Sequence, residues 1–167
     1  DAATVNIKYM NSTGILNFEL GANGVSTIDG MGAWATLSGY TLNIDGSAYT
    51  GGSKTIELHK SSNLTSTTFV STNVTGFAAE YSTAITSDEG NNNKVILTIT
   101  APPYKDWLVG YGLTGTNALS TANPDGDALN NLYEYGLGGN PTNSADIGTE
   151  PVIENGSGYV DYVHVRR

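Results

Sequence analysis

Hydrophobic and polar residues alternate along most of the first hundred positions of this chain. In a series of short runs every second side chain is apolar, and a period of two is typical of a β-strand with one buried face. The apolar positions of these runs are Val5, Ile7 and Tyr9; Leu16, Phe18 and Leu20; Tyr40, Leu42 and Ile44; Ile56 and Leu58; and Val95, Leu97 and Ile99. The pattern predicts a mainly β domain over residues 1–101.

Turn-forming residues separate these runs. They include Asn23-Gly24, Asp45-Gly46, Gly51-Gly52 and the polar segment 87–93, and their close spacing favours short antiparallel connections. We therefore predict an antiparallel β-sandwich. The alternative is the terminal part of a β-helix, because strands rich in Gly, Asn and Thr also stack in solenoids.

The hydrophobic period changes after Thr100. Pro102 and Pro103 end the last strand, and apolar residues then recur with helical spacing in two stretches. The first stretch contains Tyr104, Trp107, Leu108 and Tyr111, with Trp107 as the expected core anchor. The second contains Leu129, Leu132 and Tyr133, and we expect Leu129 and Leu132 to turn inward and anchor the second helix. The segment 102–141 is therefore predicted to form a helix, a polar loop and a second helix.

Residues 142–167 are predicted to form a linker and a C-terminal strand, because alternation returns in "GYVDYVHVRR". We expect this strand and the first one, "TVNIKY", each to pair with a sheet edge in its own domain or in a neighbouring copy. Neighbouring modules or copies of the chain are thus the expected partners. The first residues lack both a Met and an apolar leader, as at a processed end or an artificial boundary. The last strand stops at two arginines and leaves an edge to be covered, which suggests further chain or cleavage there.

The segment "NPDGDALNNLYE", residues 123–134, places oxygen-bearing groups at the spacing of a cation loop. A hard cation such as Ca²⁺ takes about six to eight oxygens, and a twelve-residue loop supplies them from positions 1, 3, 5, 7, 9 and 12, with a backbone carbonyl at position 7. Here those positions are Asn123, Asp125, Asp127, the Leu129 carbonyl, Asn131 and Glu134. The alternative is a metal-free turn in which Asp125 or Asp127 caps the second helix.

The longer segment "NPDGDALNNLYEYGLGGNP", residues 123–141, resembles the calcium repeats related to thrombospondin type 3 repeats and to dockerin and EF-hand loops. A similar segment occurs near the C-terminus of large secreted or surface proteins of environmental bacteria, after β-rich stretches similar to "TLNIDGSAYTGG" and "VTGF". The resemblance implies the same six calcium ligands and an extracellular or cell-surface location. Asn123 stands where the repeats usually have Asp, and Ala128 stands where they usually have Gly.

Charge and composition exclude several classes of partner. The chain has a formal net charge of −9, and its seven Lys and Arg residues are scattered, so no basic patch is expected to bind nucleic acid or anionic lipid. No apolar run approaches the roughly 20 residues of a membrane span, so membrane insertion is not expected. The chain has no cysteine, so disulfides and thiolate metal sites are excluded.

Recognisable catalytic motifs are also absent from the sequence. His59 and His164 lie on predicted strands, where we expect them at the surface, and neither stands in a nucleophile or zinc motif. We therefore predict a non-catalytic structural or adhesive module of a larger surface or secreted protein. The alternative is a carbohydrate-binding module of a polysaccharide-degrading enzyme, in which Trp34 stacks on a sugar ring with Tyr40 and Tyr49 nearby.

Overall fold

The computed structural model describes residues 4–6, 14–21, 27–66, 69–88 and 94–164. For residues 27–36, 60–66 and 88, and for the first strand, it describes the backbone path but not the side chains. The chain divides into two compact units, Asp1–Pro102 and Pro103–Arg167. Each unit is described by itself below.

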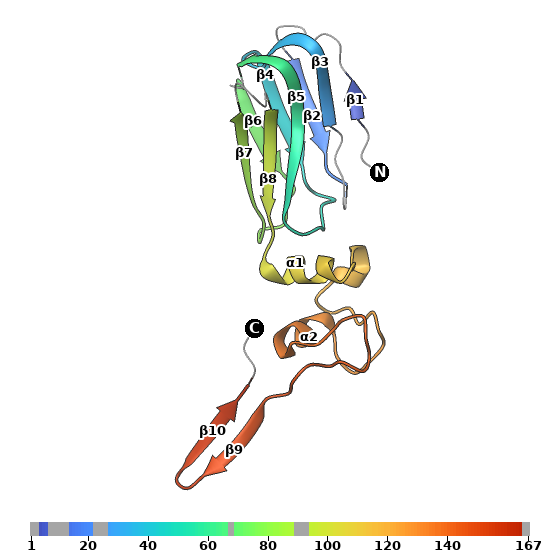
Figure 1. Cartoon of the computed structure of the whole chain (residues 1–167), viewed down its shortest axis with the longest axis vertical. Coiled ribbons are helices and arrows are strands. Elements are labelled where there is room, and N and C mark those ends of the chain that lie inside the picture. The colour runs from blue at the N-terminus through green and yellow to red at the C-terminus, as the bar shows by residue number, and fades with distance from the viewer. Residues whose placement is uncertain (1–3, 7–13, 22–26, 67–68, 89–93, 165–167) are drawn as a thin grey trace. The chain divides into compact units, whose positions relative to one another are not determined.

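The strands of the first unit form two sheets (Figure 1). The five-stranded sheet has the order β1 (Thr4–Asn6), β3 (Thr27–Thr36), β5 (Lys54–Ser66), β8 (Lys94–Thr100) and β7 (Ser82–Asp88). The three-stranded sheet has the order β2 (Gly14–Glu19), β4 (Tyr40–Asp45) and β6 (Ser71–Thr75). From β1 to β6, consecutive strands therefore belong alternately to the larger and the smaller sheet.

Strand pairing within β1 to β6 is parallel. β1 pairs with β3 and β3 with β5 in one sheet, while β2 pairs with β4 and β4 with β6 in the other. Only β8 is antiparallel to its neighbours, β5 and β7. β8 and β7 extend the larger sheet beyond β5 through antiparallel pairs. The mainly β class is confirmed, but the antiparallel pairing predicted for these six strands is wrong.

The connection after β4 shows why the turn signals misled. Asp45 accepts a hydrogen bond from the Ser47 N–H at 2.9 Å, and the Gly46 N–H donates to the Thr75 carbonyl at 2.8 Å. The Asp45-Gly46 pair thus makes a local turn, but the chain then crosses to the other sheet instead of returning beside β4. A turn signal in the sequence predicts a change of direction and not the strand to which the chain leads.

Three asparagines form a ladder across the smaller sheet. Asn17, Asn43 and Asn73 occupy the same position in the register of β2, β4 and β6. The Asn73 side-chain amide donates to Asn43, and that of Asn43 donates to Asn17, each at 2.8 Å. Stacked side-chain amides of this kind form where strands pair in register.

The apolar positions of the alternating runs form the core of the first unit. Of those whose side chains are described, all but the half-buried Leu16 are buried. The buried ones are Phe18, Leu20, Tyr40, Leu42, Ile44, Ile56, Leu58, Val95, Leu97 and Ile99. The prediction of these core positions is confirmed, while the side chains of Val5, Ile7 and Tyr9 lie outside the described residues.

His59 is buried, with 3% of its surface exposed, so its predicted position at a strand surface is wrong. The reason is a register shift between β5 and β8. Glu57 lies opposite Ile96 and His59 opposite Val95, which leaves Leu58 as an extra residue on β5. Such a β-bulge breaks the alternation, so Leu58 and His59 are both buried although they are adjacent.

The second unit contains α1 (Pro103–Gly110), the 3₁₀ helix η1 (Gly115–Ala118), α2 (Asn131–Leu137) and a hairpin of β9 (Val152–Gly156) and β10 (Tyr159–Val163). Leu108, Leu113 and Ala118 are its buried apolar cluster, and Tyr104 and Trp107 pack against them. The helix, loop and helix predicted for residues 102–141 therefore correspond to elements of the structure. Leu108 is fully buried, and Trp107, the expected core anchor of the first helix, is half-buried and packs against the cluster.

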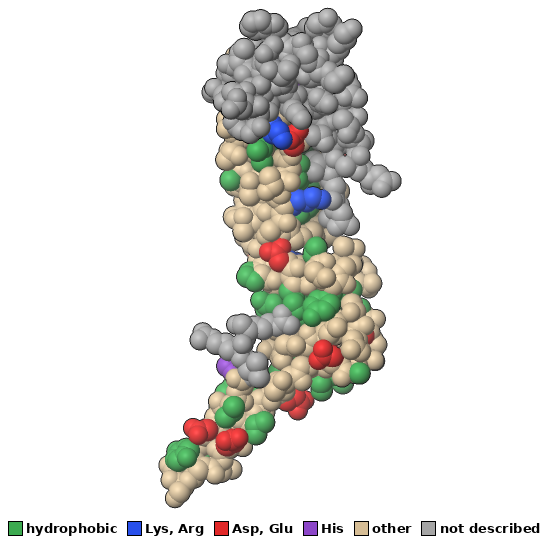
Figure 2. Space-filling view, viewed as in Figure 1, with side chains coloured by type: hydrophobic (Ala, Val, Ile, Leu, Met, Phe, Trp, Pro, Cys, Tyr) green, Lys and Arg blue, Asp and Glu red, His purple; other side chains and the backbone are tan. Residues whose placement is uncertain are grey.

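Both strands near the chain ends pair within their own unit. β1 pairs with β3, and β10 pairs with β9. The hairpin carries six exposed apolar side chains, Val152, Ile153, Tyr159, Val160, Tyr162 and Val163, and Figure 2 shows hydrophobic and acidic side chains next to each other on it. Among the described residues, no helix has the length and hydrophobicity needed to cross a bilayer.

Candidate metal centre

Helix α2 turns a polar face inward and an apolar face outward. Asn131 and Glu134, which lie three residues apart on one face, are both 0% exposed. Leu132 is 54% exposed, so the prediction that it turns inward is wrong, and Tyr133 of the same stripe is 62% exposed. Leu129, the other leucine expected inside, is half-buried. Hydrophobic periodicity alone predicts that the apolar face of this helix lies in the interior. A short helix that buries a carboxylate in its place needs a compensating partner for that charge.

Asn130 and Gly138 cap the two ends of α2. The Asn130 side chain accepts a hydrogen bond from the Tyr133 N–H at 3.1 Å, which makes Asn130 the N-cap. Gly138 ends the helix with φ of 79°. The alternative in which Asp125 or Asp127 caps this helix is therefore wrong, and both carboxylates are left for another role.

The loop before α2 is folded by its own polar groups. Asp125 Oδ1 accepts from the Asp127 N–H at 3.4 Å, and Asp127 Oδ1 accepts from the Leu129 N–H at 2.6 Å. Gly126 makes the turn between them in the left-handed region, with φ of 75°. These bonds use one oxygen of each aspartate and leave its Oδ2 atom for other contacts.

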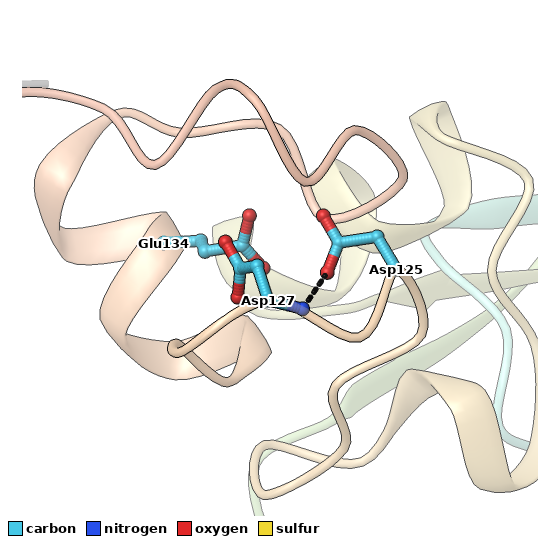
Figure 3. Close-up of side chains that lie close together, drawn as sticks. All are labelled: Asp125, Asp127 and Glu134. Carbon is cyan, nitrogen blue, oxygen red and sulfur yellow. Dashed lines mark hydrogen bonds between the residues drawn. The ribbon is translucent and has the colours of Figure 1, made fainter.

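Three carboxylates converge between this loop and α2 (Figure 3). One oxygen from each of Asp125, Asp127 and Glu134 lies within 4.8 Å of the others. Asp125 Oδ2, Asp127 Oδ2 and both carboxylate oxygens of Glu134 are buried and have no hydrogen-bond partner among the described residues. Unpaired buried carboxylates at this spacing repel one another and are poorly solvated.

No basic side chain of the described second unit lies in this cluster. Lys105 is the only Lys or Arg among residues 103–164, and its Nζ donates to the Ala118 carbonyl at 3.5 Å. Burial, followed by the charges of Asp125, Asp127 and Asp146, raises the pKa of Glu134 to about 7. The charged form of Glu134 is thus disfavoured, and a bound cation would reverse that preference.

Asn131 offers a further oxygen. Its Nδ2 donates to the Asn117 and Leu119 carbonyls, both at 2.8 Å, and its backbone N–H donates to the Ala122 carbonyl at 2.8 Å. Its Oδ1 atom is buried and has no hydrogen-bond partner in the described part of the chain. Because both amide hydrogens are engaged, the orientation of the side chain is fixed and its oxygen remains a free acceptor.

The other two predicted ligands are not part of the carboxylate cluster. Asn123 is exposed, and its Oδ1 accepts from the Gly126 N–H at 2.9 Å while its Nδ2 donates to the Asp127 carbonyl at 2.7 Å. The oxygen and the nitrogen of the Asn123 side-chain amide thus both hold the loop together. The Leu129 N–H donates to Asp127 Oδ1. The role of the Leu129 carbonyl as a ligand stays a prediction.

Sequence reasoning missed two side chains whose electrostatic interactions reach Glu134. The charge of Asp146 acts on it, and the charge of Glu134 in turn acts on Tyr104 of α1. Neither residue stands at a position of the twelve-residue loop, so the spacing of ligands gives no signal for them. Only the folded unit brings these positions close to the cluster.

Two of the three aromatic residues considered for sugar stacking, Tyr40 and Tyr49, are largely buried. Tyr40 and Tyr49 are 4% and 5% exposed, and the Tyr49 hydroxyl donates to the Gly52 carbonyl. Trp34 lies on β3, but its side chain is outside the described residues. Neither tyrosine therefore presents a free ring face to a sugar.

Comparison of the chain with protein-family models, with curated proteins and with solved structures finds no significant match.

Proposed function

We propose that the second unit binds one calcium ion through Asp125, Asp127 and Glu134, and that the ion stabilises this unit. The proposal rests on the environment of Glu134. Its carboxylate is fully buried, has no hydrogen-bond partner among the described residues and lies beside two further carboxylates. Removing the positive partner of such a group is destabilising, so a site of this kind is matched to a cation.

The chemistry of the oxygen donors favours calcium. Carboxylate and amide oxygens suit hard cations, and no Cys or His stands in the loop or on α2 to favour zinc or copper. Magnesium usually retains several waters and uses one or two carboxylates, whereas calcium accepts many protein oxygens. Asn131 Oδ1 and the Leu129 carbonyl are the protein oxygens that would complete the set. Asn123 Oδ1 accepts from the Gly126 N–H and has a second lone pair for an ion.

The wider role we propose is that of a non-catalytic structural or adhesive module in an extracellular or cell-surface protein. The resemblance of residues 123–141 to secreted calcium repeats supports the location, and extracellular calcium is abundant enough to fill weak sites. The exposed apolar hairpin supports contact with a neighbouring module, because uncovered strands with apolar side chains readily pair with other chains. In this role calcium keeps the second unit rigid.

Chelation combined with Asp125→Ala tests the calcium proposal. Extracellular calcium modules have dissociation constants of about 10⁻⁴–10⁻³ M, and a tenfold excess over that value stabilises by about 1.4 kcal/mol. We expect calcium to raise the unfolding midpoint of the second unit by about 5–10 °C and to slow hydrogen exchange over residues 113–137. Asp125→Ala should remove this response, and Asp161→Asn, at an exposed acid on β10, should retain it. Equal exchange of the wild-type chain with calcium and with chelator would refute the proposal.

A further inference from the structure

Tyr104 of α1 places an unpaired hydroxyl in the interior of the second unit. Its Oη atom is buried and has no hydrogen-bond partner in the described part of the chain. Its ring contacts Trp107 at a centroid distance of 6.0 Å and Tyr135 at 5.2 Å. Tyr135 directly follows Glu134, so Tyr104 lies against the turn of α2 that carries the buried carboxylate.

Tyr104 and Glu134 each carry a buried polar group without a hydrogen-bond partner, and one is a donor while the other is an acceptor. The hydroxyl is a buried donor without an acceptor, and Glu134 has two buried acceptor oxygens without a donor. A buried polar group without a partner is destabilising, so such groups are nearly always satisfied in a native protein. The two groups are not bonded to each other in the described structure, since each lacks any hydrogen-bond partner there, and the contact of the Tyr104 ring with Tyr135 places them in the same part of the unit.

We propose, resting on the calcium site proposed above, that Tyr104 is a positioning residue whose hydroxyl donates to one carboxylate oxygen of Glu134 and so aims that carboxylate at the ion. Carboxylate ligands of metal ions are commonly held by hydrogen bonds from surrounding residues, and each oxygen can accept more than one contact. Tyr104 does not touch the ion itself. Through it, calcium binding also orders α1.

Aromatic contacts connect Tyr104 to further side chains of α1 and α2. Trp107 contacts Tyr135 at 5.2 Å and Tyr111 at 5.4 Å, so the ring cluster joins α1 to α2. When Glu134 moves toward an ion and Tyr104 follows it, the rings of Trp107 and Tyr135 must adjust because they contact Tyr104. Calcium should therefore alter the near-ultraviolet signal of these rings, although none of them is a ligand.

Calorimetric calcium titration of the chelator-stripped full chain and its Tyr104→Phe variant tests the proposal. The substitution keeps the ring and its packing and removes only the hydroxyl. Loss of a partner that orients a metal ligand weakens affinity by about 10–100-fold, so we expect at least about a tenfold increase in the dissociation constant. Tyr111→Phe is the matched control, because Tyr111 belongs to the same ring cluster and is 37% exposed. It should bind calcium as tightly as the wild type.

The outcomes separate the two proposals. A wild-type chain that takes up no calcium overturns the calcium site and the role of Tyr104 with it. Wild-type binding with an unchanged constant in Tyr104→Phe overturns the role of Tyr104 alone. A purely structural role would lower the metal-free unfolding midpoint and leave the affinity unchanged. If Tyr104→Phe does not fold, the tyrosine absorption of the wild type decides: a calcium-induced change in a buried tyrosine supports the bond, and an unchanged spectrum overturns it.

Discussion

Replacing Glu134 with glutamine is expected to abolish the calcium response of the second unit and, in chelator at pH 8, to make that unit more stable than the wild type. Glutamine has nearly the same shape but no charge, so it removes the repulsion by Asp125 and Asp127 and the poor solvation of a buried carboxylate. It also removes a direct ligand. Because losing an outer partner weakens affinity by roughly 10–100-fold, we expect losing Glu134 to weaken it by at least about 100-fold.

The pH dependence of stability gives the same prediction a second readout. Without metal, the pKa of Glu134 is about 7 in the folded chain against an ordinary value of 4.5, so the folded state holds the proton more tightly. The free energy of unfolding should then fall as pH rises from about 4.5 to 7, because over that range the folded state binds more protons than the unfolded state. With saturating calcium this fall should disappear, because the ion keeps the carboxylate charged in the folded state and the stability it adds is lost only as pH drops below the ordinary value of 4.5. Glu134→Gln should remove the fall that is seen without metal.

Unfolding of the second unit, followed by hydrogen exchange over residues 123–137 at several pH values, measures these effects. Glu150→Gln is the matched control, because Glu150 is an exposed acid of the same unit. It should keep both the calcium response and the pH dependence of the wild type. A metal-free Glu134→Gln variant that is less stable than the wild type at pH 8 would contradict the account of a strained, buried carboxylate.

Leu97→Ala is expected to destabilise the first unit by about 2–5 kcal/mol, which is the range for truncating a buried leucine. Leu97 is 0% exposed at the centre of β8, the strand that joins the parallel part of its sheet to β7. The calcium response of the second unit should not change, because Leu97 belongs to the first unit and the candidate ligands belong to the second. Denaturant unfolding and calcium titration of the same variant measure the two properties.

Thr98→Ala serves as the control for Leu97→Ala. Thr98 lies on the same strand, and its half-buried side chain lies on the opposite face from that of Leu97. Its loss should alter stability by less than about 1 kcal/mol. If both variants lost the same free energy, the assignment of Leu97 to the buried core of the first unit would be wrong.

The sequence predicted the core of the first unit well because burial follows the period of the strand. Tyr40, Leu42 and Ile44 are buried whether their strand pairs parallel or antiparallel. Pairing itself is non-local, and nothing in the alternation shows that β4 lies between β2 and β6. The β-bulge that buries His59 is equally invisible, because it depends on the register against β8.

The candidate site was predicted by ligand spacing and not by hydrophobicity. Spacing selected Asp125, Asp127 and Glu134, which the structure brings together. The apolar stripe suggested that Leu132 faces inward, whereas α2 exposes Leu132 and buries Asn131 and Glu134. A polar inner face on so short a helix makes sense only with a partner for its charge, and that partner cannot be read from hydrophobic periodicity.

A crystal structure of the chain grown with calcium would test the central claim most directly. We predict one ion between the loop and α2, with oxygens of Asp125, Asp127 and Glu134 at about 2.3–2.6 Å and Asn131 Oδ1 or the Leu129 carbonyl nearby. The anomalous scattering of the ion would identify the element. Carboxylates of Asp125 and Asp127 that point apart into solvent at saturating calcium, with no ion between them and Glu134, would contradict the account.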